Sequence, residues 1–112
     1  MEPKLIMRDL TLFYAALSDE TRLRLLSLMT GREVCVCYLQ EVLKTNQPKI
    51  SRHLAYLKKA GLVEARRDGK WTHYRLKKQV NGLDKVLSQT LARLGRERQV
   101  ARDLFRLKQV SC

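Results

Sequence analysis

Three cysteines carry the most distinctive chemistry in this 112-residue chain. Cys35 and Cys37 lie one residue apart within an apolar stretch, and Cys112 stands at the last position. Two thiols this close together are typical of a metal-binding or redox site. Cysteine is also a small apolar residue that proteins often bury, so the pair alone fits a core position equally well. The odd number of cysteines argues against a framework of disulfides.

A second set of candidate residues is basic. The chain has 23 Lys and Arg against 11 Asp and Glu, a net charge of +12, which fits a polyanionic partner such as nucleic acid or an anionic membrane surface. Side chains that pair with bases or neutralise phosphate gather on one predicted helix and at the tip of a predicted hairpin. These candidate DNA contacts are Gln47, Lys49, Ser51, Arg52, His53 and Tyr56 on the helix and Arg66, Arg67 and Lys70 on the hairpin. The alternatives are a solvated basic surface and, for His53, a place in the core.

The helix that carries these contacts is predicted by its caps. Asn46 is placed as its N-cap, Pro48 lies in its first turn and Gly61 ends it. A short helix over residues 34–44 precedes it, and about three residues join the two. The sequence therefore predicts a helix-turn-helix over residues 34–61.

After Gly61 the apolar period changes from 3.6 to 2. This change predicts a β-hairpin over residues 62–76, with Asp68 and Gly69 as its two-residue turn. An isolated hairpin of this length is marginal, so we expect it to lean on the helices.

Apolar stripes predict helices at both ends of the chain. One stripe consists of Ile6, Leu10, Phe13 and Leu17, and Ser18 is then placed as the N-cap of a second helix. A last helix is predicted over residues 83–107, with its stripe at Leu83, Leu87, Leu91 and Leu94 and with Gly95 in its middle. The two terminal stripes fit either a dimer surface or cover for the monomer core.

Several of these segments resemble the ArsR/SmtB family of winged-helix repressors. Residues 51–63 (SRHLAYLKKAGLV) look like the family's recognition helix, and residues 68–76 (DGKWTHYRL) resemble its wing. Residues 17–26 (LSDETRLRLL) resemble the entry to its second helix. Residues 33–39 (EVCVCYL) are similar to the cysteine motif of its arsenic-responsive branch. The resemblance covers roughly residues 12–76.

The resemblance implies a mainly α-helical fold with a small β-hairpin, in which residues 1–112 form a single winged helix-turn-helix domain. It also implies a homodimeric transcriptional repressor that binds double-stranded operator DNA, with the terminal helices at the dimer interface. The effector would be trivalent arsenic or antimony, as arsenite, antimonite or methylarsenite. Binding of this effector to cysteine thiolates would release the DNA.

The thiol site departs from the family motif at one position. The motif has a third cysteine three positions after the second, where this chain has Gln40. Trivalent arsenic favours three soft thiolates, so Cys112 of either subunit is the candidate third ligand beside Cys35 and Cys37, and a two-thiol site is the alternative. Residues i and i+2 of a helix point about 200° apart. We therefore expect effector binding to distort the helix over residues 34–44.

Other function classes have less support. No apolar run is long enough to span a membrane, the N-terminus resembles no signal peptide, and a cytoplasmic protein is expected. The sequence shows no enzyme motif, and only His53 and His73 are present as histidine ligands for zinc. Two alternatives to a metalloid sensor remain: a winged-helix repressor whose thiols sense oxidants, and a small basic module that binds nucleic acid or protein without an effector.

Overall fold

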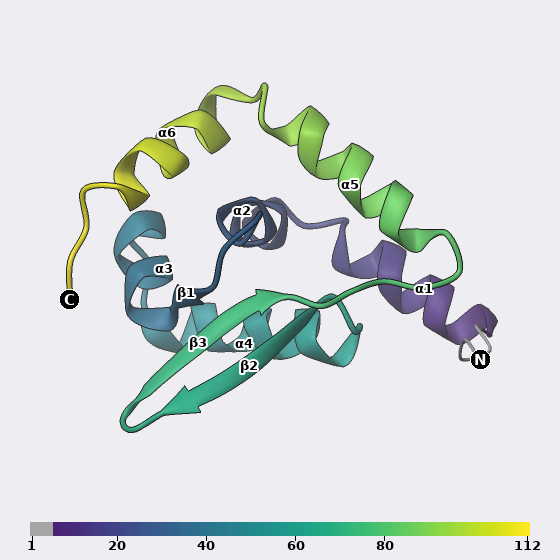
Figure 1. Cartoon of the computed structure of the whole chain (residues 1–112), viewed down its shortest axis with the longest axis horizontal. Helices are drawn as coiled ribbons and strands as arrows, with labels where there is room; N and C mark the ends of the chain where they lie inside the picture. Colours follow the sequence, from purple (N-terminus) through teal and green to yellow (C-terminus); the bar gives the residue numbers. More distant parts are fainter. Residues whose placement is uncertain (1–5) are drawn as a thin grey trace.

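The computed structural model describes residues 6–112 and contains six helices and three strands within them. The elements in chain order are α1 (Met7–Ala16), α2 (Glu20–Leu28), β1 (Val34–Cys35), α3 (Val36–Leu43), α4 (Gln47–Lys59), β2 (Val63–Asp68), β3 (Trp71–Leu76), α5 (Leu83–Leu94) and α6 (Arg98–Leu107). Figure 1 shows helix α2 at the centre, with α5 and α6 forming a bent arc around it and the β2–β3 hairpin projecting on the other side.

The apolar core lies where α2, α3 and α4 meet. Most of its fully buried side chains come from these helices and the strand that follows them: Leu25, Leu26, Leu28, Leu39, Val42, Ile50, Leu54, Leu57, Leu62 and Val63. Phe13 and Ala16 of α1 complete this core from the N-terminal side. The mainly α-helical winged helix-turn-helix fold predicted from the sequence is confirmed.

Two capping predictions have different outcomes. Asn46 caps α4 as predicted, because its side chain accepts a hydrogen bond from the backbone N–H of Lys49 at 2.9 Å. Ser18 is not the cap of α2. The cap is Asp19, whose carboxylate accepts from the backbone N–H of Arg22 at 3.0 Å, while the Ser18 hydroxyl donates to the Ala15 carbonyl. A carboxylate suits this position because it also complements the positive end of the helix dipole.

The predicted isolated hairpin is part of a three-stranded antiparallel sheet in the order β1-β3-β2. Strand β1 pairs with β3 through Val34 opposite Tyr74 and Cys35 opposite His73. The prediction of helix from residue 34 is therefore wrong by two residues. Pairing with β3 and burial of the Val34 side chain hold these two residues in an extended conformation, and the third strand supports an otherwise marginal hairpin.

The hairpin turn lies one residue later than predicted. Asp68 is paired with Trp71, so Gly69 and Lys70 form the two-residue turn. Gly69 has a φ of +61°, a conformation that glycine adopts without strain.

The predicted C-terminal helix over residues 83–107 is two helices. Helix α5 ends at Leu94 and α6 begins at Arg98, with Gly95 at the C-cap of α5. Glycine is a poor helix former, and the bend lets α6 fold back so that Val100 and Asp103 are buried. No helix within residues 6–112 is long and apolar enough to cross a membrane.

Candidate nucleic-acid interface and thiol site

Helix α4 has a buried apolar face and an exposed polar face. Ile50, Leu54 and Leu57 are buried in the core. The opposite face exposes the predicted contacts Gln47, Lys49, Ser51, Arg52 and Tyr56. This arrangement fixes the helix by its inner face and leaves a surface that can hydrogen-bond to bases and phosphates.

His53 differs from its neighbours on α4 because it is half-buried against α2. Its Nδ1 lies 3.4 Å from Nη1 of Arg22 and 3.8 Å from a carboxylate oxygen of Asp19. Burial lowers the pKa of His53 below its ordinary value, against the opposing charge of Asp19. This environment favours a structural role for His53 between α2 and α4 over the predicted role as a base contact.

Arg22 of α2 organises the same surface, and our sequence analysis did not select it. Its guanidinium donates to the backbone carbonyls of Ala16 at 2.9 Å and Ala15 at 3.0 Å. It also lies over the Tyr56 ring, 4.2 Å from the centroid. These contacts tie the end of α1 to α4 and hold Tyr56 in place. The sequence signal was its place beside the Asp19 cap, because Arg22 also donates its backbone N–H to Asp19.

The three basic residues of the hairpin are exposed at its tip. Arg67 donates to the Gly69 carbonyl at 3.0 Å, and the Lys70 ammonium lies 5.1 Å from the Trp71 ring centroid. Arg66 is engaged by Glu33, whose carboxylate accepts hydrogen bonds from Nε and Nη2 of Arg66. This guanidinium holds the pKa of the Glu33 carboxyl below its ordinary value. The Arg66–Glu33 pair therefore joins the wing to the segment that leads into β1.

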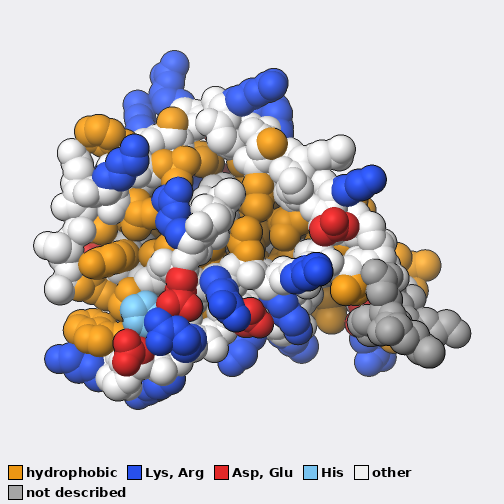
Figure 2. Space-filling model, in the orientation of Figure 1, with side chains coloured by type: hydrophobic (Ala, Val, Ile, Leu, Met, Phe, Trp, Pro, Cys, Tyr) orange, Lys and Arg blue, Asp and Glu red, His pale blue; other side chains and the backbone are white. Residues whose placement is uncertain are grey.

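Figure 2 shows how charge and apolar surface are distributed on one face of the molecule. Lys and Arg side chains surround the rim, while apolar side chains gather between the α5–α6 arc and the hairpin. A groove of about 610 Å³ lies there, lined by α5 and by the end of β3; its apolar side chains are Leu76, Leu87, Leu91 and Ala92. The apolar stripe of α5 is thus only partly covered within one chain.

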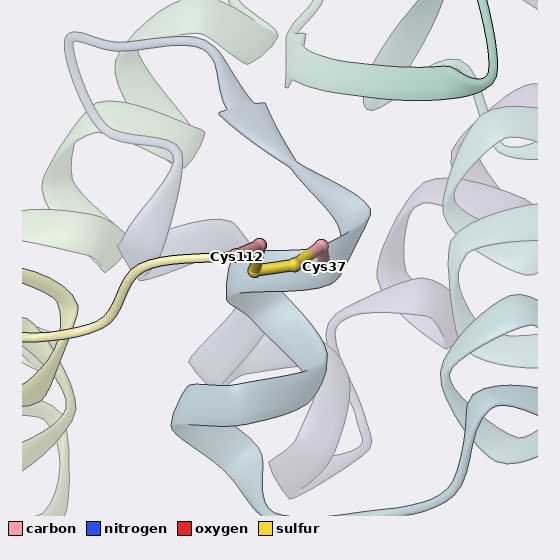
Figure 3. Close-up of a disulfide and its surroundings, with 2 residues drawn as sticks. All are labelled: Cys37 and Cys112. Atoms are coloured by element: carbon pink, nitrogen blue, oxygen red, sulfur yellow. A yellow bond between two sulfur atoms is a disulfide. The ribbon is translucent and has the colours of Figure 1, made fainter.

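The structure brings the C-terminus to the two cysteines near α3. Cys37, in the first turn of α3, and Cys112 form a disulfide, with their Cα atoms 6.4 Å apart (Figure 3). Cys35 is a free, buried thiol at the N-cap of α3. The odd number of cysteines argued against a framework of disulfides; the structure has a bond between Cys37 and Cys112 and leaves Cys35 free. The sequence did not reveal this pair because 75 positions separate the two cysteines.

A pocket of about 320 Å³ joins the remaining thiol to this disulfide. Cys35 and Cys112 both line it, together with Glu33, Tyr38, Trp71 and His73. Gln40, at the position of the family's third cysteine, does not line it. Within residues 6–112, the structure holds no ready-made group of three metal-ligating side chains. Three thiols become available as soft ligands here only after the disulfide is reduced.

Cys35 lies outside the helix, so the angle of about 200° expected between Cys35 and Cys37 within one helix does not apply. Cys35 ends strand β1 with φ −69° and ψ 141°, so Cys35 and Cys37 lie on either side of a strand-to-helix junction and not within one helix. A ligand bound by both thiols would act on this junction, and Cys35 is paired with His73 of the wing.

Comparison with known proteins gives consistent results. The family model described as "Bacterial regulatory protein, arsR family" matches residues 19–65. The arsenical resistance operon repressor of Escherichia coli is 52% identical over 64 residues, which are 56% of this chain and 55% of that protein. An HTH-type transcriptional regulator of Methanocaldococcus jannaschii is 47% identical over 62 residues, 54% of this chain and 70% of that protein.

A solved structure extends the likeness beyond the matched segment. The homodimeric winged helix-turn-helix DNA-binding domain of a possible ArsR-family regulator from Mycobacterium bovis aligns with a TM-score of 0.67 at 27% identity. The alignment covers 82% of this chain and 87% of that one. The chain spans about half the length of the arsenic-resistance repressor it matches. Its fold, the match over the helix-turn-helix and these relatives together place the chain in the arsR family of bacterial regulatory proteins.

Proposed function

We propose that this protein is a homodimeric transcriptional repressor that binds double-stranded operator DNA and releases it on binding trivalent arsenic or antimony. The main observation in favour of DNA binding is that two basic elements, helix α4 and the β2–β3 hairpin, follow each other directly on either side of Gly61. The exposed face of α4 is set to enter a major groove, and the exposed tip of the β2–β3 wing is set to contact the adjacent phosphate backbone. An arsenical resistance operon repressor and an arsenic resistance transcriptional regulator among the relatives support the same assignment.

The proposed DNA contacts are the exposed side chains of both elements. Gln47, Ser51 and Arg52 are positioned to read bases, and Lys49 is positioned to neutralise phosphate. Tyr56 extends this surface with support from Arg22. On the β2–β3 hairpin, Arg67 and Lys70 are the proposed phosphate contacts. Arg66 can contact phosphate only when its ion pair with Glu33 is broken. His53 is assigned a supporting place between α2 and α4.

The proposed effector site consists of Cys35, Cys37 and Cys112 in their reduced form. Arsenite bound to three thiols forms three arsenic–sulfur bonds and releases three water molecules, with no change in oxidation state. Methylarsenite has two exchangeable positions and needs only two of these thiols. The shared pocket of Cys35 and Cys112 and the bond between Cys37 and Cys112 support this ligand set.

Two paths connect this site with the DNA-binding elements. Cys37 lies on α3, the first helix of the helix-turn-helix, which packs against α4. Cys35 lies on β1, which is hydrogen-bonded to β3 of the wing. A metalloid that draws the two thiols together therefore displaces both elements of the DNA-binding surface at once. This gives negative coupling between effector and operator.

The terminal helices are proposed as the dimer surface. Helix α1 exposes large apolar side chains at Met7 and Tyr14, with Ile6 just before it; these residues are 76%, 53% and 54% exposed. The apolar groove along α5 offers a second uncovered surface. The homodimeric structural relative supports a second copy of this chain as the occupant of these surfaces.

Fluorescence anisotropy tests the proposal. Labelled DNA from upstream of the protein's own gene is bound by the reduced protein, and arsenite is then added. We expect release with the wild-type protein, and retention of the DNA with Cys35→Ser and Cys37→Ser. Normal release by both variants would show that the site is misassigned. The DNA-binding part would be wrong if binding were independent of sequence and disappeared with salt alone.

The Cys37–Cys112 disulfide favours a second candidate function, a repressor that senses oxidants. In that case peroxide would release the DNA by forming this disulfide, and Cys112→Ser would abolish the response. Arsenite added to fully reduced protein would then have no effect. The same anisotropy assay, run with peroxide in one arm and with arsenite plus a phosphine reductant in the other, separates the two functions.

A further inference from the structure

Helix α6 contains a buried acidic residue that neither the DNA-binding surface nor the thiol site explains. Asp103 is completely buried, although most other residues of α6 are exposed or half-buried. Its carboxylate accepts two hydrogen bonds from Arg24 of α2, one from Nε at 2.8 Å and one from Nη2 at 2.9 Å. Gln99, one turn earlier on α6, donates a third at 3.0 Å.

This pair is the main polar attachment of α6 to the rest of the chain. The side chains that α6 buries fully are Asp103 and Val100, while Leu104 and Leu107 are only partly buried. A bidentate Arg–carboxylate contact fixes orientation and register, which two weakly covered leucines do not. Figure 1 shows α6 passing beside α2 and α3 with the C-terminus next to α3. The Arg24–Asp103 pair therefore fixes the position of the end of α6, from which the last five residues extend.

We propose that Asp103 is a positioning residue for Cys112: by anchoring α6 to α2, it holds the C-terminal thiol within reach of Cys37. The positioning role is argued from the Arg24–Asp103 contact and the Cys37–Cys112 bond alone. Its consequence, that Asp103 strengthens metalloid binding, also rests on the proposed function.

The length of free chain gives the size of the effect. With α6 docked, Cys112 is five residues beyond Leu107, the last residue of α6. With α6 released, the free chain begins at Leu94, the end of α5, and is eighteen residues long. The effective concentration of a tethered group falls roughly as the −3/2 power of tether length, so release of α6 lowers that of Cys112 at Cys37 by about sevenfold.

Equilibration with glutathione measures this effective concentration without DNA or metalloid. Glutathione disulfide oxidises the Cys37 and Cys112 thiols to the protein disulfide and is itself reduced to two glutathione molecules. Alkylation of the remaining thiols and mass spectrometry give the disulfide fraction, with Cys35 as a free thiol in both forms. We expect Asp103→Asn to lower the effective concentration by at least twofold, with about sevenfold as the limit for complete release of α6. The matched control Glu64→Gln, which breaks an exposed carboxylate–arginine pair with Arg75, should leave it unchanged.

The result that overturns the proposal is an unchanged effective concentration in Asp103→Asn. If circular dichroism shows that this variant does not fold, the measurement is made with Arg24→Lys, which keeps the positive charge but cannot make the bidentate contact. At least a twofold decrease is expected there, and no decrease would again overturn the proposal.

A double-mutant cycle separates positioning from general destabilisation. Arsenite affinity of the reduced protein is measured by calorimetry for the wild type, Asp103→Asn, Cys112→Ser and the double variant. If Asp103 acts through Cys112, Asp103→Asn weakens binding in the wild-type background and has no effect once Cys112 is absent. Equal losses in both backgrounds would contradict it. Failure of the wild type to bind arsenite would refute the proposed effector, while the glutathione equilibrium would still decide the role of Asp103.

Discussion

The helix-turn-helix and the C-terminal helices are built in opposite ways. Helices α2, α3 and α4 supply most of the fully buried side chains, and α4 buries one whole face. Helices α5 and α6 bury Leu83, Leu87, Val100 and Asp103, and the rest of their apolar stripe is partly covered. The difference indicates that a continuous apolar core holds the DNA-binding helices, whereas fewer buried contacts hold α5 and α6, among them the Arg24–Asp103 pair.

The sharpest test of this contrast compares two leucines. Leu54→Ala, in the core of α4, should lower the free energy of unfolding by about 2–5 kcal/mol, because it leaves a cavity among fully buried neighbours. Leu107→Ala, at the end of α6, should cost about 1 kcal/mol or less because its site is partly open. Urea unfolding of both variants at one protein concentration measures this. Equal losses would refute the contrast.

The second prediction separates specific contact from general charge. Arg52→Ala should weaken operator binding by about 1–3 kcal/mol, roughly 5- to 150-fold, if Arg52 reads a base. Arg102→Ala removes the same charge from an exposed position on α6 and should change affinity only slightly. Anisotropy at two salt concentrations gives both values. An equal effect of the two substitutions would mean that the operator is attracted by net charge alone.

A smaller effect is expected from pH at the contact between α2 and α4. Burial lowers the pKa of His53 in the folded state, so the unfolded chain binds a proton more readily. Stability should therefore fall as pH decreases through about 6.5, the ordinary pKa of histidine. His53→Gln should give a shallower dependence in urea unfolding between pH 7 and 5. A steeper dependence in that variant would show that His53 gains a stabilising charge on folding.

The smallest effect is expected at the exposed pair between the wing and β1. Glu33→Gln removes the nearer carboxylate partner of Arg66, leaves Asp68 at 3.9 Å, and makes the guanidinium more available to phosphate. Operator affinity should rise by about two- to threefold at low salt, since exposed pairs of this kind are weak. Gel-shift titration against Glu64→Gln, which leaves Arg66 paired, provides the comparison. A decrease in affinity would mean that the pair holds the wing in its binding position.

The contrast between the two regions also explains what the sequence could predict. Caps and period were sufficient for α4, because Asn46, Pro48 and Gly61 are local signals. The hairpin followed from the change of period, but β1 did not, because two extended residues depend on pairing with Tyr74 and His73 for their conformation. Gly95 was noted as a weak point of one long helix, but the sequence did not show that α6 folds back there, because the contact that holds it joins Asp103 to Arg24, 79 positions away.

The sequence predicted which cysteines form the candidate thiol site, but not how they are arranged in space. The spacing of Cys35 and Cys37 selected them, and Cys112 was included only as a possible third ligand. The fold brings Cys112 to Cys37 through the return of α6, which no local pattern encodes. Arg22 was missed for the same reason, because its role comes from tertiary contacts with Ala16 and Tyr56.

We propose that effector binding at the cysteines and DNA binding at α4 and the β2–β3 hairpin oppose each other within the same protein. Calorimetric titration of arsenite into the reduced protein, free and bound to its operator, tests this claim most directly. Linkage requires the operator to weaken arsenite binding by the same factor as arsenite weakens operator binding, typically about 5- to 150-fold. A matching pair of factors is the predicted result. Equal arsenite affinity of the free and the DNA-bound protein would contradict the account.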